Sequence, residues 1–405
     1  MAASLGPRCR PCSLAAGPLE DEDLLCEILL GLPPEPSSLP RASAVCKRWR
    51  RLISDLGFSR RFCRHHRRNP PVLGLFIRGG EGIPFQPTLE APNRVPPGRF
   101  SFPRRDGAIF ISLGCLHGLL LILNIRPIQV LVWDPINGKQ HRLAIPAWFL
   151  THGTKSMNGA VLRAARDIQQ FHVVLTVVDN VDIQHRRALA CVYSSETGIW
   201  GDVISAPVPY KVPQTSLLIS DDATLFCTIR PGVLVGDSLY WILSGNFPGI
   251  LKFDLKKQSI AVIQVPQHML QNGFYNSWIV RAEGGGLGLL WKTDHSFQLW
   301  KKKTDCDGVA SWVLGTTIEL DKLLPLCEKR SQIILGFAEE NNAVFVWTDG
   351  LLFMVHLDSL QFKKLCEPRT SSYYHPFESV YTPVTYFGTE GVTCNFVPSQ
   401  FLIIG

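Results

Sequence analysis

Sequence motifs of enzymes are absent from this chain. It has no His-Glu-x-x-His zinc motif and no Gly-x-Ser-x-Gly nucleophile elbow. Four glycines fall within Gly284–Gly288, but neither the Lys-Ser/Thr of a phosphate-binding loop nor a helical pattern follows them, and a tight turn between strands is expected. No nucleophile stands beside a recognisable base. We therefore expect no catalytic residues, no cofactor and no enzymatic activity.

Cysteine pairs at metal-binding spacing are also lacking. Of twelve cysteines only Cys9 and Cys12 form a Cys-x-x-Cys, and no second pair stands at zinc-finger distance. His65 and His66 lie among arginines, whose charge opposes metal binding, so we expect surface histidines and no metal site. The sequence has no Asn-x-Ser/Thr sequon either. Buried free thiols in a reducing compartment, the cytoplasm or the nucleus, fit this pattern best.

No apolar run is long enough to cross a bilayer. The longest, residues 108–123, is broken by a serine, a histidine and two glycines and is shorter than the ~20 residues required. Residues 1–18 lack acidic side chains, and their apolar stretch is too short for a secretory signal. A disordered leader is expected there, with an organellar transit peptide as the alternative. We expect a soluble protein.

Helical periodicity appears first between residues 20 and 32. Asp23 is placed to cap a helix, and the acidic residues before it stand where the helix dipole favours negative charge. Apolar residues then recur at helical spacing and form one stripe. Its members are Leu24, Leu25, Ile28, Leu29 and Leu32. Pro33, Pro34 and Pro36 end the helix, because proline has no amide to donate to the next turn.

A second amphipathic helix is expected after the prolines. Ser37 or Ser38 can cap it, with Pro40 tolerated in its first turn. The apolar residues that would share its face are Ala42, Val45, Cys46, Trp49, Leu52 and Ile53. Phe58 and Phe62 indicate a short third helix. A segment this small buries too little apolar surface to be stable alone, so a protein partner is expected.

The order of these features resembles an F-box. The matching segments are Asp-Leu-Leu-x-Glu-Ile-Leu from Asp23, Leu-Pro at 32–33 and Val-Cys-Lys-Arg-Trp-Arg-x-Leu from Val45. Glu20 and Gly31 depart from the usual pattern, but neither is an apolar contact residue. The resemblance implies that residues 19–66 dock on a Skp-type adaptor, and through it on a cullin-RING ubiquitin ligase. The adaptor-binding residues that it implies are Leu24, Leu25, Ile28, Leu29, Pro33, Val45, Trp49 and Leu52. The alternative is a helical hairpin packed privately on its own protein.

Positive charge is concentrated in the same module. Residues 41–68 hold ten arginines and lysines against Asp55 alone, a local charge of +9, so the net charge of +7 leaves −2 for the rest of the chain. Such a cluster can bind nucleic acid or an anionic membrane. Because few aromatic residues are interleaved with it, we expect a solvated or partner-facing helix surface, with neither nucleic acid nor membrane bound.

After residue 71 the pattern changes to short apolar runs separated by turn residues. Five hairpin units recur, at Val130–Leu143, Cys191–Trp200, Leu251–Ile263, Leu299–Val313 and Met354–Leu365. Most follow a further strand, at Gly118–Leu123, Ser238–Leu243, Gly286–Lys292 and Ala343–Thr348. Their turn markers, Asp134, Ser195, Asp254, Asp305 and Asp358, are 61, 59, 51 and 53 residues apart. Spacings near the ~50 residues of a kelch repeat predict the blades of a β-propeller.

Residues 72–387 would hold about six such blades. The sixth could be closed by Val72–Ile77 pairing with Tyr373–Tyr386. The segments 79–107 and 147–166 are expected to be long surface loops, plausible parts of a binding face. The fold class is thus α+β multidomain, a small helical module followed by a mainly-β, kelch-like propeller, with a pair of β-sandwiches as the alternative to the propeller. Residues 388–405 are expected to be a divergent tail.

The large domain also resembles the propeller-like associated domain of a plant F-box family, especially that of grasses. The segments that carry this resemblance begin at Val132, Tyr193, Val235, Arg281 and Trp300. Together the two resemblances imply a substrate-recruiting subunit of an SCF-type ubiquitin ligase, whose β domain holds an unknown target protein. One alternative is a module that binds a glycan or small ligand without ligase output. Another is a propeller enzyme, which would need a metal or cofactor for which the sequence offers no ligands.

Overall fold

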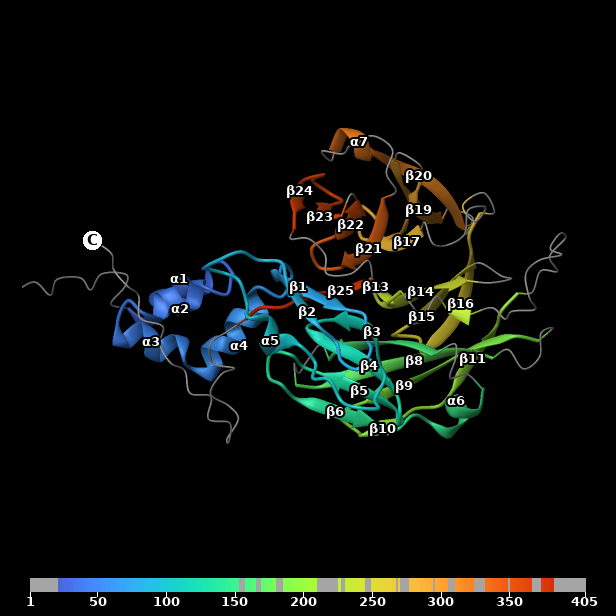
Figure 1. The fold of residues 1–405 in the computed structure, drawn as a ribbon, viewed down its shortest axis with the longest axis horizontal. Coiled ribbons are helices and arrows are strands. Elements are labelled where there is room, and N and C mark those ends of the chain that lie inside the picture. The colour runs from blue at the N-terminus through green and yellow to red at the C-terminus, as the bar shows by residue number, and fades with distance from the viewer. Residues whose placement is uncertain are drawn as a thin grey trace, which may run out of the picture. The chain divides into compact units, whose positions relative to one another are not determined.

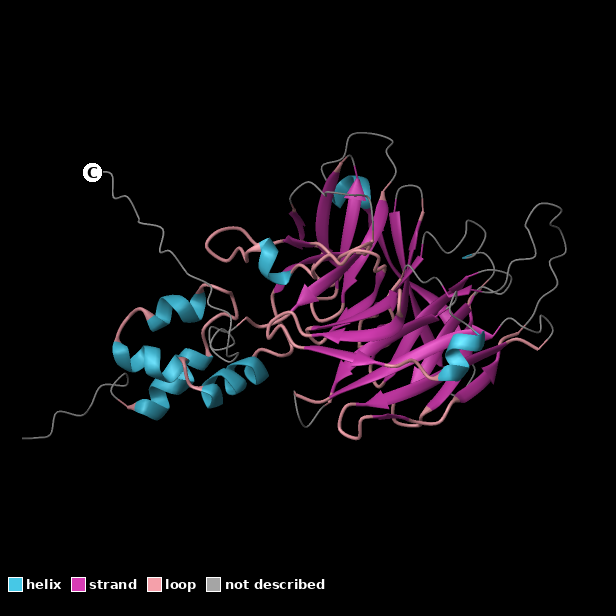
Figure 2. Ribbon diagram, turned by 60° about the horizontal axis from the view of Figure 1, so that its bottom comes forward, coloured by secondary structure: helices cyan, strands magenta, loops and turns pink. Residues whose placement is uncertain are grey.

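The computed structural model describes residues 21–152, 157–164, 169–179, 185–209, 225–226, 230–244, 249–266, 269, 277–293, 296–304, 310–323, 332–348, 350–365 and 373–381. The chain divides into two compact units. The helical unit comprises residues 1–67 and 380–405, and the propeller unit comprises residues 68–379. The regions predicted as a leader, residues 1–18, and a tail, residues 388–405, lie outside the described residues. Figure 2 shows helices in the first unit and mostly strands in the second.

The helical unit contains four helices in its described part (Figure 1). They are α1 (Glu22–Leu30), α2 (Ser38–Ser43), α3 (Lys47–Ile53) and α4 (Leu56–His65). The prediction that Asp23 caps α1 is wrong. Asp21 is the N-cap, and its Oδ1 accepts the amides of Asp23 and Leu24 at 2.9 and 3.1 Å. Asp23 instead lies in the first turn, where the helix dipole favours its charge.

The single helix predicted after the prolines is two helices in the structure. The chain leaves the helical conformation at Ala44–Cys46, where Cys46 is extended (φ −159°) and its Sγ accepts the Trp49 amide at 3.5 Å. As a result Val45 and Cys46 are exposed and do not share the buried face of Ala42 and Ile53. The predicted third helix is confirmed as α4, whose N-cap Asp55 accepts the Phe58 amide at 2.8 Å.

One small apolar core holds the four helices together. Its buried members are Leu25, Leu29, Leu30, Leu39, Ala42, Ile53, Phe58 and Phe62. His66 closes α4 onto α1, with its Nε2 2.9 Å from the Leu30 carbonyl, and desolvation lowers its pKa. His66 is therefore half-buried, and the prediction of a surface histidine is wrong for it. Its position at the end of α4, one turn from Phe62, brings its ring against the Phe62 ring.

The propeller unit consists of six antiparallel blades around a common axis (Figure 1). Blade 1 is β3 (Phe110–Leu116), β4 (Leu119–Ile125), β5 (Ile128–Trp133) and β6 (Gln140–Leu143). Blade 2 is β7 (Met157–Arg163), β8 (Phe171–Asp179), β9 (Arg187–Ser194), β10 (Ile199–Trp200) and β11 (Ile204–Pro207). Blade 3 is β12 (Leu225–Phe226), β13 (Val233–Val235), β14 (Ser238–Ser244), β15 (Gly249–Asp254) and β16 (Ser259–Gln264).

The remaining three blades complete the ring. Blade 4 is β17 (Ser277–Arg281), β18 (Leu287–Lys292), β19 (Ser296–Thr304) and β20 (Ala310–Glu319), followed by the short helix α7 (Leu320–Leu323). Blade 5 is β21 (Ile333–Ala338), β22 (Ala343–Thr348), β23 (Leu351–His356) and β24 (Phe362–Lys364). Blade 6 is β25 (Tyr374–Glu378), β1 (Val72–Ile77) and β2 (Phe85–Pro87). Each of the five predicted hairpins forms the outer pair of one blade.

Blade 6 joins the two ends of the propeller unit. β1 pairs with β25 in an antiparallel register that places Leu75 opposite Pro376 and Phe76 opposite His375. This confirms the predicted pairing of Val72–Ile77 with the C-terminal stretch, as far as residue 381 is described. β25 in turn lies between β21 of blade 5 and β3 of blade 1. The ring is therefore closed by strands that are about 300 residues apart in sequence.

The segment predicted as a surface loop at 79–107 is partly core. It contains β2 and the short helix α5 (Pro97–Phe100), and its buried side chains include Ile83, Phe85, Val95, Phe100 and Phe102. The rings of Phe85 and Phe100 lie 5.2 Å apart, and Phe102 packs at 5.1 Å on Trp133 of blade 1. These aromatic residues fill the junction between blades 6 and 1, which explains why a proline- and glycine-rich segment is ordered there.

The segment 147–166 was also predicted as a surface loop, and this is wrong for its described part. The segment contains α6 (Ala147–His152) and the buried inner strand β7. Phe149 belongs to the apolar core between blades 1 and 2, together with Met157 and Val161 of β7. Asn158 and Gly159 of β7 obscured the strand pattern in the sequence, because neither is typical of a strand. Both lie in a close-packed interior, and a larger residue at 159 would meet the Val174 carbonyl.

Candidate functional site

The eight residues predicted to bind an adaptor fall into three groups in the helical unit. Leu25 and Leu29 are fully buried in its core. Trp49 and Leu52 are half-buried and pack against that core. The remaining four, Leu24, Ile28, Pro33 and Val45, are exposed, with exposed fractions of 50% for Leu24, 47% for Ile28 and 63% for Val45.

The geometry of α1 explains this division. Leu24 and Ile28 are four residues apart and share one face of the helix, whereas Leu25 and Leu29 share the neighbouring face and enter the core. The apolar stripe seen in the sequence is therefore wider than the core needs. Branched aliphatic side chains left half in water lose the free energy that their burial would provide, about 1.5–3 kcal/mol each if fully covered.

Leu56 is a further exposed apolar residue that the sequence pattern did not single out. It is the first residue of α4 and has an exposed fraction of 63%. With Leu24, Ile28, Pro33 and Val45 it makes up what we call the exposed apolar set of the helical unit. The signal that could have found Leu56 is its position directly after the cap Asp55, outside the Phe58–Phe62 stripe.

Basic side chains are also exposed on the helical unit. Arg61 binds Glu27 at 2.7 Å and Arg51 lies 3.9 Å from Glu22, both on the surface of α1. Most other arginines and lysines of residues 41–68 are exposed. A unit that exposes both apolar and basic side chains suits a protein partner with an apolar and acidic surface.

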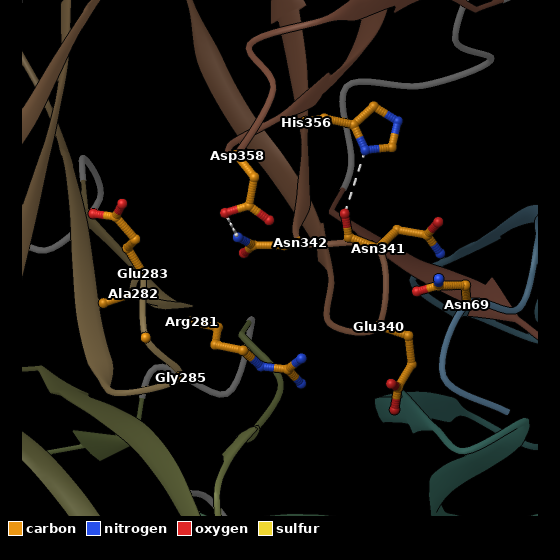
Figure 3. Close-up of a pocket in the computed structure, with 11 residues that line it drawn as sticks. Asn69, Arg281, Ala282, Glu283, Gly285, Glu340, Asn341, Asn342, His356 and Asp358 are labelled. Carbon is orange, nitrogen blue, oxygen red and sulfur yellow. Dashed lines mark hydrogen bonds between the residues drawn. The ribbon is translucent and has the colours of Figure 1, made fainter.

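The propeller unit carries a polar pocket of about 430 Å³ (Figure 3). It is formed by turns of two neighbouring blades and by Asn69, which precedes β1. The β17–β18 turn of blade 4 contributes Arg281, Ala282, Glu283, Gly284 and Gly285. The β21–β22 and β23–β24 turns of blade 5 contribute Glu340, Asn341, Asn342, His356 and Asp358. The glycine-rich segment thus forms the tight turn that was expected, with φ of +81° at Gly284 and +80° at Gly285.

Hydrogen bonds fix the blade 5 side of this pocket. Asn342 adopts a left-handed conformation (φ +44°), and its Nδ2 donates to Asp358 Oδ1 at 2.9 Å. The side chain of Asn341 has different partners from that of Asn342. Its Nδ2 donates to Glu378 Oε1 at 2.6 Å and to the Pro70 carbonyl at 2.9 Å. The Nδ1 atom of His356 lies 3.3 Å from the Asn341 carbonyl. The turn is therefore rigidly held before any ligand arrives.

Two further carboxyl groups, the buried Glu339 and the half-buried Glu378, adjoin residues of the pocket. Glu339 is 6% exposed, and its Oε2 accepts the Leu234 amide of blade 3 at 2.9 Å. Desolvation raises the pKa of Glu339 well above its usual value, and it also raises the pKa of Glu378. Glu339 thus joins blade 5 to blade 3, and Glu378 of blade 6 accepts the Glu340 and Asn341 amides of blade 5. The position of both groups serves the structure of the ring.

A second polar network joins blades 1, 2 and 5. Arg163 donates from Nη2 to Asp134 Oδ2 at 2.7 Å and from Nε to the His117 carbonyl at 2.9 Å. The Arg163 amide donates to His117 Nδ1 at 3.3 Å, while His117 Nε2 lies 3.8 Å from Glu340. The ring of His117 thus has polar partners at the β3–β4 hairpin turn.

Among the residues that the structure describes, no group of three or more His, Cys, Asp or Glu could hold a metal ion. No helix in the described ranges is long and apolar enough to span a membrane. The described residues therefore present two surfaces of interest, the exposed apolar set of the helical unit and the polar pocket of the propeller unit. The pocket was not predicted, because its residues come from three turns that are far apart in sequence.

Comparison with known proteins assigns a family to each unit. Residues 113–385 match the family model "F-box protein AT5G49610-like, beta-propeller", and residues 22–65 match the model "F-box-like". The chain is similar to F-box protein At5g03970 of Arabidopsis thaliana, with 20% identity over 84% of this chain and 81% of that protein. It is also similar to the putative F-box protein At3g16210 of the same plant, with 24% identity over 64% of this chain and 63% of that protein.

Solved structures overlap with the chain more loosely. A protein of unknown function from Bacteroides caccae covers 75% of this chain with 98% of its own length, at 10% identity and a TM-score of 0.42. The family models carry the assignment: the propeller model spans about two thirds of the chain, and the F-box model covers all four described helices. Six blades and an N-terminal F-box make the architecture of a substrate receptor. The chain belongs to the plant F-box proteins with an AT5G49610-like β-propeller.

Proposed function

We propose that this protein is a substrate-recruiting subunit of an SCF-type ubiquitin ligase. Its F-box would dock on a Skp-type adaptor, and through it on a cullin-RING ligase, while the propeller holds a target protein. The observation that carries the proposal is the exposed apolar set on a helical unit of the F-box family. F-box domains generally bind Skp-type adaptors, and apolar side chains left in water are what such a partner would cover.

The exposed fractions support a division among the proposed contact residues. Leu24, Ile28, Pro33 and Val45 would touch the adaptor directly, and the half-buried Trp49 and Leu52 would border them. Leu25 and Leu29 would contribute indirectly, because they are buried and hold α1 on the core. The F-box would thus span residues 19–66, as predicted, and the recognition domain residues 72–387.

In this role the chain performs no bond chemistry. Its contribution is proximity, since a target held on the propeller meets the charged ubiquitin-conjugating enzyme as part of one assembly. The effective concentration of a target lysine then depends on the geometry of the assembly rather than on diffusion. We propose the cytoplasm or nucleus as its location, where cullin-RING ligases would meet it.

Paired variants of α1 test the proposed interface. Leu24→Asp with Ile28→Asp places two charges in the apolar contact while leaving the core intact, and we expect at least a hundredfold loss of adaptor affinity, about 3 kcal/mol. The control is Glu22→Lys, which changes the exposed N-terminal turn of the same helix. It should keep binding within a few-fold. Affinity is measured by calorimetry with the full chain.

The folded state of these variants separates interface from stability effects. Helical circular dichroism and protection of the α1 amides should be unchanged in the Leu24/Ile28 variant. A Leu29→Asp variant should lose that protection, because it buries a charge among Leu25, Phe58 and Phe62. Unaltered adaptor binding by the folded Leu24/Ile28 variant would rule out the proposed contact.

A second candidate function is a ligand-binding module without ligase output. The polar pocket of the propeller favours it, because a cavity of about 430 Å³ is large enough for a small molecule. The pocket has no Trp or Tyr in its lining, so it offers no stacking platform for a glycan. Among the described residues a small polar molecule therefore fits this alternative better than a sugar chain.

A further inference from the structure

The pocket between the turns of blades 4 and 5 contains a buried acceptor without a partner. Asn342 is 8% exposed and lines the pocket, and its Oδ1 makes no hydrogen bond while its Nδ2 is held by Asp358. A buried acceptor left unsatisfied is destabilising, because its desolvation is not compensated. Because the left-handed turn and the bond to Asp358 fix the amide, this oxygen is held in one orientation at the wall of the pocket (Figure 3).

Arg281 supplies the opposite kind of group on the facing side. It is the last residue of β17, and its side chain extends into the pocket from blade 4 (Figure 3). Its guanidinium makes no hydrogen bond or ion pair with any residue that the structure describes, and its charge acts on the buried Glu339 carboxyl. Five N–H donors in a planar fork therefore face the cavity, an arrangement that suits a carboxylate.

The acidic residues of the pocket differ in their availability. Glu283 is paired with Lys301. Glu340 lies beside His117 of blade 1. Asp358 accepts from Asn342 through Oδ1, and as a carboxylate it has lone pairs left for a second donor. Asp358 and the Asn342 oxygen together form an acceptor pair that suits an ammonium group.

Several ligand classes fit this arrangement poorly. An inorganic phosphate has no cationic group to pair with the Asp358 carboxylate and the Asn342 oxygen. A divalent cation would find no group of three His, Cys, Asp or Glu among the described residues. A purely apolar ligand would leave both the Arg281 donors and the Asn342 oxygen desolvated and unpaired, which is costly.

We propose that this pocket binds a small zwitterion of the α-amino-acid type. The ligand carboxylate would pair with the Arg281 guanidinium, and its ammonium group would donate to Asn342 Oδ1 and Asp358. The volume of about 430 Å³ leaves room for a side chain beyond these two groups. The site goes beyond adaptor docking, and its occupancy does not depend on the helical unit.

The probe is a set of the twenty L-amino acids, tested singly against the full chain by saturation-transfer NMR and calorimetry. We expect at least one of them to bind saturably. Its N-acetyl derivative removes the ammonium charge and its primary amide removes the carboxylate, and each should bind at least tenfold more weakly. Absence of saturable binding by any of the twenty would overturn the proposal. So would equal affinity for the derivatives.

Two variants locate the binding, each with a matched control. Arg281→Gln removes the cation, and Asn342→Gly removes the acceptor while keeping a residue that tolerates positive φ. The controls are Arg142→Gln, on an exposed strand of blade 1, and Gln258→Gly, at the positive φ of another hairpin turn. Both pocket variants should weaken binding at least tenfold, and both controls should bind as the unaltered chain does.

Folding and adaptor binding serve as separate checks. The four variants should unfold within a few degrees of the unaltered chain and should bind a Skp-type adaptor equally. A folded Arg281→Gln variant that keeps full affinity for the amino acid would place binding elsewhere and overturn the proposal. Because the NMR measurement is made without an adaptor, its result is independent of the ubiquitin-ligase proposal.

Discussion

The Asp134 carboxylate accepts four hydrogen bonds from two blades. Its Oδ1 accepts the amides of Ile136 and Asn137 at 3.0 and 3.2 Å, which shapes the β5–β6 turn. Its Oδ2 accepts from Asn137 Nδ2 at 3.0 Å and from Arg163 Nη2 at 2.7 Å. A turn marker read from the sequence as a local feature therefore also joins blade 1 to blade 2.

Replacing Asp134 should consequently cost more than replacing an equivalent turn residue. Asp134→Ala removes these bonds and leaves the Arg163 guanidinium, only 20% exposed, without its counter-ion, so we expect a loss of about 2–4 kcal/mol. Asp254→Ala is the matched control, since Asp254 accepts the corresponding two amides in blade 3, and its ion-pair partner Lys252 lies on the same strand and is more exposed than Arg163. Denaturant unfolding of both variants measures the difference. Equal losses would contradict the role of Asp134 between blades.

Individual residues also show where sequence reasoning stops. The apolar stripe of α1 was recognised from its spacing, but spacing alone does not distinguish Leu24 from Leu25, because the two adjacent faces differ only in what packs on them. The N-cap is Asp21 and not Asp23. Both residues lie in an acidic run in which any member could cap the helix, so the sequence alone does not distinguish them. Side-chain exposure and cap geometry depend on the tertiary structure, and a single sequence does not specify them.

At the scale of elements, closure depends on β25. His375 of β25 is 1% exposed, and its Nε2 lies 3.1 Å from the Ser112 carbonyl of β3, which ties blade 6 to blade 1. Desolvation, with Arg78 nearby as the second cause, lowers the pKa of His375 from 6.5 to about 4. The imidazole of His375 is therefore neutral in the folded protein over most of the pH range.

This burial predicts a loss of stability in mild acid. Below pH 6.5 the unfolded chain binds a proton at His375, whereas the folded chain does not bind one until about pH 4. The free energy of unfolding therefore falls as pH drops through that window. Between pH 7.5 and 5 the expected loss from this group is about 2 kcal/mol. Glu339 and Glu378 act in the opposite sense, because their raised pKa values make the folded state gain stability as pH falls.

A His375→Gln variant isolates the histidine contribution. It removes the titration while keeping an amide that can donate to the Ser112 carbonyl. The difference in unfolding free energy between the two proteins should shift by about 2 kcal/mol from pH 7.5 to pH 5, in favour of the variant. A difference that is constant with pH would show that His375 keeps its ordinary pKa in the folded protein.

Regular elements were predicted better than irregular ones. The five hairpins were found because alternating apolar residues and turn residues recur together, and each is an outer pair of a blade. The break at Ala44–Cys46 was missed because no proline or glycine marks it. The segment 79–107 was misjudged because its proline and glycine content concealed Phe85, Phe100 and Phe102, whose burial depends on a junction formed by distant strands.

At the scale of the whole molecule, the two units present different kinds of surface. The helical unit carries an apolar surface larger than its own core requires, and the propeller unit presents turns of different blades to a common face. The number of blades followed from repeat spacing and from the pairing of β1 with β25. The pocket was not predicted from the sequence, since Arg281, Asn342 and Asp358 come together only when blades 4 and 5 are placed side by side.

The most direct test of the proposed receptor role is co-expression of the full chain with a Skp-type adaptor. Size-exclusion chromatography with light scattering then reports the mass of the species that contains both chains. The account predicts comigration at one-to-one stoichiometry, with the adaptor lost from the Leu24/Ile28 variant. A folded full chain that elutes alone in the presence of excess adaptor would contradict it.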